Sequence, residues 1–68
     1  MPKAEKLRKL ERGEKVRPPK KWWSRMRRRI GQMQKYKEFG AARKSRIVAG
    51  IWHGYSVATQ KRLVRRYG

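Results

Sequence analysis

An excess of positive charge constrains this chain more than any other sequence feature. Its 68 residues include 22 Lys and Arg against four acidic residues, which gives a formal net charge of +18 at pH 7. A chain this short forms one domain, and below roughly 70–80 residues a hydrophobic core supplies only about 3–5 kcal/mol of stability. Because like charges repel in a compact state, we expect a small fold that a polyanionic partner stabilises.

The composition also excludes several classes of protein. Cysteine is absent, which removes disulfides, thiolate metal sites and thiol catalysis. No apolar run approaches the roughly 18–20 residues that span a bilayer, and residues 1–10 lack the apolar segment of a signal peptide. We therefore expect an intracellular protein associated with a nucleoid, a virion or a ribosome, and not a secreted one.

Residues 1–17 form the first of two expected regions. They hold seven basic and three acidic side chains, but Leu7, Leu10 and Val16 are their only sizeable apolar residues after the initiator. So few apolar side chains cannot build a core, and the Pro-Pro pair at 18–19 interrupts the chain after them. The sequence therefore predicts a basic N-terminal arm that is flexible or becomes ordered on a partner.

Residues 18–68 form the second expected region. Apolar residues recur every three or four positions along 19–33, 41–53 and 57–67, as one face of a helix requires. A connector at 34–40 joins the first two of these segments. The predicted fold class is all-α, with a small three-helix domain behind the basic arm.

The three tryptophans supply much of the apolar surface available to this domain. Trp52 lies in the middle of the apolar stripe of the second helix, which predicts that it is the hub of the core. Trp22 and Trp23 point about 100° apart on the first helix, so we expect one in the core and the other near the surface. The Val and Ile cluster at 46–51 leaves a short strand as the competing structure there.

Basic residues occupy the side of each expected helix away from its apolar stripe. A Lys or Arg placed on a phosphate releases condensed counterions, so such surfaces bind nucleic acid with little sequence preference. The chain has no Asn and only three scattered Gln, which leaves no evident cluster for reading bases. The candidate nucleic-acid-binding residues are Lys20, Lys21, Trp22, Arg25, Arg27, Arg28, Arg29, Arg43, Lys44, Arg46, Lys61, Arg62, Arg65 and Arg66.

We expect duplex DNA as the partner, bound by an architectural or packaging protein through phosphate contacts and aromatic insertion. A small ribosomal protein that binds structured RNA is the alternative, because such proteins share the basic arm and the small helical body. A cationic membrane-active helix is the lesser alternative, since Trp22, Trp23 and Met26 lie opposite an Arg and Lys face. The oligomeric state stays open.

The sequence offers little for catalysis. His53 is the only histidine, and no Asp exists to orient it. Ser45, Ser56 and Thr59 are typical polar or capping residues, with Ser56 placed to cap the third helix. The four Glu residues make neither a metal cage nor an acid and base pair. We therefore expect no enzymatic activity, no catalytic residue, no metal, no cofactor and no small-molecule substrate.

Three short sequence elements are similar to elements of one known family. Residues 17–23 read Arg-Pro-Pro-Lys-Lys-Trp-Trp, residues 49–52 read Ala-Gly-Ile-Trp, and Ser56 and Lys61 follow. In this respect residues 17–64 resemble the HMG-box DNA-binding domains, which open with Arg-Pro before paired aromatics and carry Gly-x-x-Trp near the end of helix two. The glycine is one residue nearer the tryptophan here. The same elements are also similar to short uncharacterised phage and archaeal basic proteins.

The HMG-box resemblance implies a particular mode of DNA binding. Lys20, Lys21, Arg25 and Arg28 would lie along the minor groove, with an exposed Trp22 or Met26 as the wedge that kinks a base step. An HMG box has a long third helix that packs against its N-terminal strand. The third helix expected here is short, so the resemblance implies a truncated version.

Overall fold

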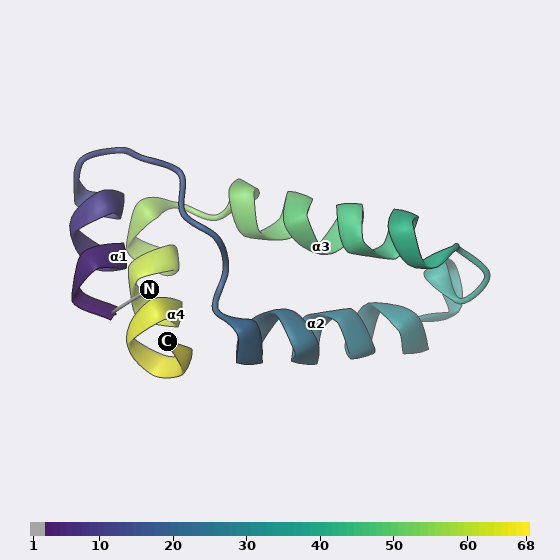
Figure 1. Ribbon diagram of the computed structural model, residues 1–68. Helices are drawn as coiled ribbons and strands as arrows, with labels where there is room; N and C mark the ends of the chain where they lie inside the picture. The colour runs from purple at the N-terminus through teal and green to yellow at the C-terminus, as the bar shows by residue number, and fades with distance from the viewer. Residues whose placement is uncertain (1–2) are drawn as a thin grey trace.

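Two pairs of helices make up the fold (Figure 1). A computed structural model describes residues 3–68, so the first two residues of the expected arm lie outside it. Helices α1 (Lys3–Glu11) and α4 (Val57–Tyr67) lie side by side, and α2 (Lys20–Gln32) and α3 (Ala41–Gly54) form an antiparallel hairpin. The α1–α4 pair crosses one end of that hairpin, in a molecule of 38 × 18 × 17 Å. The all-α fold class is confirmed.

The helix boundaries after residue 18 agree closely with the apolar periodicity. Helix α2 starts behind Pro19, whose carbonyl oxygen accepts a hydrogen bond from the Trp23 N–H at 2.9 Å. Helix α4 starts behind Ser56, whose hydroxyl accepts from the Thr59 N–H at 3.3 Å, which confirms the predicted cap. Residues 46–51 belong to α3, so the alternative of a strand there is wrong.

The expected connector at 34–40 is a compact turn. It contains the short 3₁₀ helix η1 (Gln34–Tyr36), and the rings of Tyr36 and Phe39 meet edge to face with centroids 5.5 Å apart. Gly40 then precedes α3 in an extended conformation. This aromatic contact lies within the turn that joins α2 to α3.

The N-terminal region differs from the sequence-based expectation. Residues 3–11 form a helix packed on α4, so the described chain has four α-helices where three were predicted. Leu10 and Val16 are 3% and 7% exposed and belong to the core. A few apolar residues suffice because α1 packs along α4 and the Val16 carbonyl accepts from Trp52 of α3, which are tertiary contacts that local periodicity does not reveal. The expectation that a partner orders residues 1–17 stays a prediction.

Helix α1 ends in a well-defined reversal of the chain. Gly13 has a φ of 80°, in the left-handed region that glycine adopts without steric cost. The Gly13 N–H donates to the Leu10 carbonyl at 3.1 Å, and the Glu14 N–H donates to the Lys9 carbonyl at 3.0 Å. This pair of bonds is a Schellman motif, which turns the chain into the extended segment that leads to α2.

Trp52 lies at the centre of the core, as the sequence predicts. Its side chain is fully buried, and its indole N–H donates to the Val16 carbonyl at 3.0 Å. Its ring centroid lies 5.3 Å from that of Trp22, and the Gln60 side-chain amide donates to the Trp52 carbonyl at 2.8 Å. One residue of α3 therefore contacts α2, α4 and the segment before α2.

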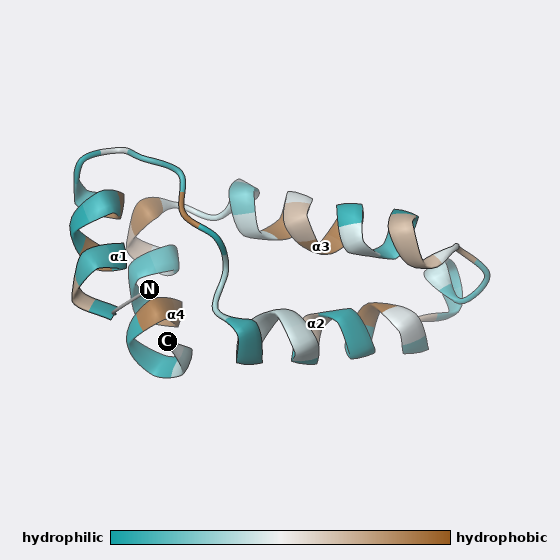
Figure 2. Cartoon of the chain, in the orientation of Figure 1, coloured by the Kyte–Doolittle hydropathy of each residue, from teal (hydrophilic) through white to brown (hydrophobic). Residues whose placement is uncertain are grey.

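Most residues of α1 and α2 are hydrophilic (Figure 2). Hydrophobic residues are confined to short stretches of the helices and to one in the segment between α1 and α2, which contains Val16, in agreement with a small core. The fold thus buries its few large apolar residues between the helices, from the junction of the two helix pairs to Ile30 near the end of α2, and exposes basic side chains around them.

Candidate nucleic-acid interface

A groove between α2 and α4 gathers the arginines of α2. It has a volume of about 620 Å³, and Arg25, Arg28 and Arg29 line it from one side. Leu63 and Tyr67 line it from α4, and no acidic side chain takes part. These three arginines lie on that side because positions 25, 28 and 29 share one edge of α2, next to its buried stripe. We call this hollow the α2–α4 groove.

Trp22 also borders the α2–α4 groove, but its predicted role as an exposed wedge is wrong. The side chain is only 4% exposed. Its ring packs against Trp52 and lies 6.0 Å from that of Tyr55, edge to face. The reason is helical phase, since Trp22 is four residues before Met26 and eight before Ile30 and therefore heads the buried stripe.

A second hollow, of about 570 Å³, lies at the start of α2. Lys20, Lys21 and Arg25 line it together with Trp23 and Tyr67. Trp23 is half-buried, so it is the tryptophan of the pair with exposed ring surface. Sequence reasoning did not select Trp23 or Tyr67 as site residues. Helical phase could have indicated Trp23, because it falls at the edge of the stripe that runs through Trp22.

Tyr67 connects the basic surfaces of α2 and α4. The Arg25 guanidinium lies 6.0 Å from the centroid of its ring, and the Arg66 guanidinium lies 5.5 Å from it. Guanidinium groups at this distance are attracted to an aromatic face. The tyrosine therefore holds two candidate residues, Arg25 and Arg66, near one another.

The remaining candidates on α4 form a separate strip. Lys61, Arg62 and Arg65 line a shallow hollow of about 550 Å³ on that helix. The Lys61 ammonium lies 3.1 Å from a carboxylate oxygen of Glu11, and this pair, in which Glu11 is exposed and Lys61 half-buried, contributes at most about 1 kcal/mol. This strip is cationic, but one of its members already has an acidic neighbour.

Arg27 of α2 and the candidates on α3 do not join the α2–α4 groove. Arg27 and Lys44 are half-buried, and their charged ends both lie close to Gly31. The Arg43 guanidinium lies 3.9 Å from the centroid of the Phe39 ring, and Arg46 is exposed. The predicted set of basic residues is therefore divided among several surfaces.

The side chains that could serve catalysis lie at helix ends: the histidine is exposed, and one of the hydroxyls caps α4. His53 is exposed in the last turn of α3, and the Ser56 and Thr59 hydroxyls lie 3.1 Å apart at the start of α4. Within residues 3–68, no three His, Cys, Asp or Glu side chains lie close enough to hold a metal ion. None of the helices in that range is long and apolar enough to cross a membrane.

Comparison with known proteins gives no relative for this chain. No family model matches it, and neither does any curated protein or solved structure. The function must therefore be argued from the geometry and charge of the surfaces described above.

Proposed function

We propose that the chain is a non-enzymatic nucleic-acid-binding protein with little sequence preference, and that it acts as an architectural or packaging binder of duplex DNA. The observation that carries this proposal is the convergence of Arg25, Arg28 and Arg29 in the α2–α4 groove, with no acidic side chain in its lining. A guanidinium presents several N–H donors in a fixed fork that fits phosphate oxygens.

The spacing of these arginines supports contacts to phosphates two nucleotide steps apart on one strand. Arg25 and Arg29 are one helical turn apart, which is about 6 Å along the axis of α2. Two nucleotide steps of a DNA strand cover about 6.8 Å along the duplex. The two side chains can therefore follow one strand, while Tyr67 and Met26 supply apolar surface in the same groove.

The HMG-box resemblance supports the same partner. It implies minor-groove contacts by Lys20, Lys21, Arg25 and Arg28, which are exposed on α2. Because Trp22 is buried, Met26 is the residue that can take the implied wedge role; it is half-buried and lines the groove. The role proposed here would place the protein at a nucleoid or in a virion.

The core supports a self-contained DNA binder over a ribosomal protein that orders only on rRNA. Trp52 and Val64 are fully buried, and Leu10 on α1 contributes to the same cluster. A chain with such a core is expected to melt cooperatively without nucleic acid. Circular dichroism of the free protein measures this directly, and a non-cooperative melt would favour the ribosomal alternative.

Competition between nucleic acids tests the proposed partner. We expect DNA and RNA duplexes of equal length, titrated at two salt concentrations, to show binding to DNA at least as tight as to RNA. End-labelled DNA should also show bending by energy transfer when the protein binds. A clear preference for RNA without DNA bending would reject the architectural role. Leakage of anionic vesicles without DNA binding would favour the membrane-active alternative.

A further inference from the structure

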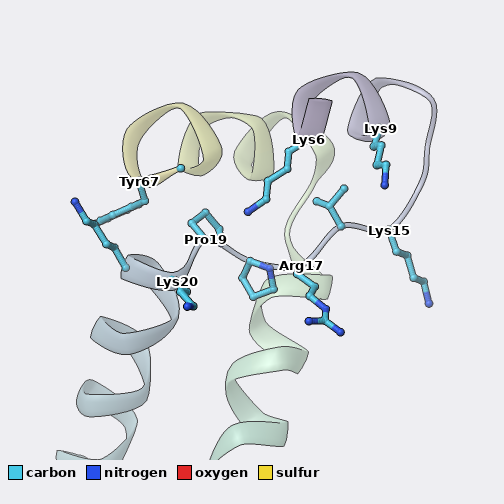
Figure 3. Close-up of a pocket in the computed structure, with 11 residues that line it drawn as sticks. Lys6, Lys9, Lys15, Arg17, Pro19, Lys20 and Tyr67 are labelled. Carbon is cyan, nitrogen blue, oxygen red and sulfur yellow. The ribbon is translucent and has the colours of Figure 1, made fainter. Parts of the chain in front are cut away.

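A fourth hollow lies on the N-terminal side of the molecule and shares only Tyr67 with the α2–α4 groove. It has a volume of about 790 Å³ and is enclosed by α1, the extended segment before α2, the start of α2 and the end of α4 (Figure 3). Buried Val16 and Pro19 contribute its apolar surface. We call it the N-terminal hollow.

Six basic side chains surround the N-terminal hollow. They come from three segments of the chain and are Lys6, Lys9, Lys15, Arg17, Lys20 and Lys21. Figure 3 shows Lys6 extending from α1 toward Pro19, with Lys15 and Arg17 on the segment that passes beneath α1. Folding therefore brings together cations that are up to 15 positions apart in the sequence (Lys6 to Lys21).

No acidic side chain compensates this concentration of charge within the lining. The lining contains no Asp or Glu, and the two ion pairs within residues 3–68 join Arg12 to Glu14 and Lys61 to Glu11. A concave surface with low-dielectric walls and charge of one sign focuses the field and attracts counterions. The hollow is therefore suited to a ligand that carries several negative charges in a small volume.

We propose that the N-terminal hollow binds a run of closely spaced phosphate groups. Its volume falls in the range of about 300–1,000 Å³ that is typical of ligand sites, so several phosphates can enter together. The ligand can be a free oligophosphate chain or the phosphate backbone of a nucleic acid. Of these two ligands, only the nucleic-acid backbone rests on the proposed function.

Such an anion would also hold α1 in place. Lys6 and Lys9 belong to α1, Lys15 and Arg17 to the extended segment, and Lys20 to α2. A phosphate chain between them replaces repulsion by attraction and stabilises the docked arrangement increasingly as the ligand concentration rises above its dissociation constant. Bound ligand should therefore raise the melting temperature and slow hydrogen exchange of the α1 amides.

Titration with sodium tripolyphosphate near physiological salt tests the site. Lys6→Gln/Lys15→Gln removes two charges from the hollow, whereas Lys35→Gln/Lys37→Gln removes two from the far end of the hairpin. We expect the wild type and the hairpin variant to bind tripolyphosphate within about twofold of one another. The hollow variant should bind it at least about tenfold more weakly, because two charged hydrogen bonds are lost.

A second hollow variant, Lys15→Gln/Lys21→Gln, changes only exposed side chains and should give the same loss with unchanged helicity. Equal weakening in the hollow and hairpin variants, or no saturable binding to the wild type, would overturn the proposal. Neither result would depend on whether the wild type binds duplex DNA, so the two proposals fail separately.

Binding of duplex DNA by the same variants distinguishes a nucleic-acid backbone from a free oligophosphate as the ligand of the hollow. If Lys6→Gln/Lys15→Gln weakens DNA binding more than Lys35→Gln/Lys37→Gln does, the hollow holds the nucleic-acid backbone. If the two variants bind DNA equally while tripolyphosphate binding differs, the hollow is a site for a free oligophosphate. Both results support a phosphate site at this place.

Discussion

Trp52→Ala is expected to destabilise the protein by about 3–5 kcal/mol, which is enough to abolish cooperative unfolding in so small a domain. The fully buried ring packs against Trp22, and its indole N–H donates to the Val16 carbonyl. Removing it leaves a cavity where three parts of the chain meet and an unpaired carbonyl in the segment before α2. Thermal and urea denaturation followed by circular dichroism measure the effect.

Trp23→Ala is the matched control for the loss of an indole ring. Trp23 is half-buried at the edge of the core, so its replacement should cost distinctly less than that of Trp52. Near-native helicity and an unchanged unfolding midpoint for Trp52→Ala would show that the core lies elsewhere.

Arg25→Gln/Arg28→Gln/Arg29→Gln is expected to weaken duplex DNA binding on the order of 100-fold near 0.1 M salt. Each phosphate contact contributes about 0.9 to the slope of log K against log salt, so three lost contacts should reduce its magnitude by about three. All three side chains are exposed and make no ion pair within residues 3–68, so we expect the fold to remain intact. Fluorescence anisotropy at several salt concentrations measures both quantities.

The matched control for this triple removes the same charge from other surfaces. Arg8→Gln/Lys35→Gln/Lys37→Gln changes three exposed cations outside the α2–α4 groove. Its effect on DNA affinity should be less than about tenfold, because only long-range attraction is lost. Equal losses in the two triples would mean that net charge alone, and not the groove, determines binding.

Much of the hairpin and of α4 could be predicted from the sequence because local periodicity encodes them. The expected helices at 41–53 and 57–67 agree with α3 and α4 within one residue. The Ser56 cap and the central place of Trp52 follow from the same local patterns. In each case the residues that determine the structure lie within one or two turns of each other.

Tertiary contacts account for what the sequence did not reveal. Leu10 and Val16 are too few to signal a packed segment, and their burial becomes favourable only when α1 docks on α4 and the Val16 segment meets Trp52 of α3. The choice between Trp22 and Trp23, by contrast, follows from the phase of the α2 stripe, since Trp22 stands four and eight residues before Met26 and Ile30. The N-terminal hollow escaped prediction because Lys6, Lys15 and Lys20 meet only after α1 has folded back on α4.

The salt dependence of duplex DNA binding tests the central claim most directly, since that claim is that the unbalanced cations contact phosphates. With about eight contacts, log K should fall with log salt with a slope near −7. A slope near zero, or no binding at moderate salt, would contradict it.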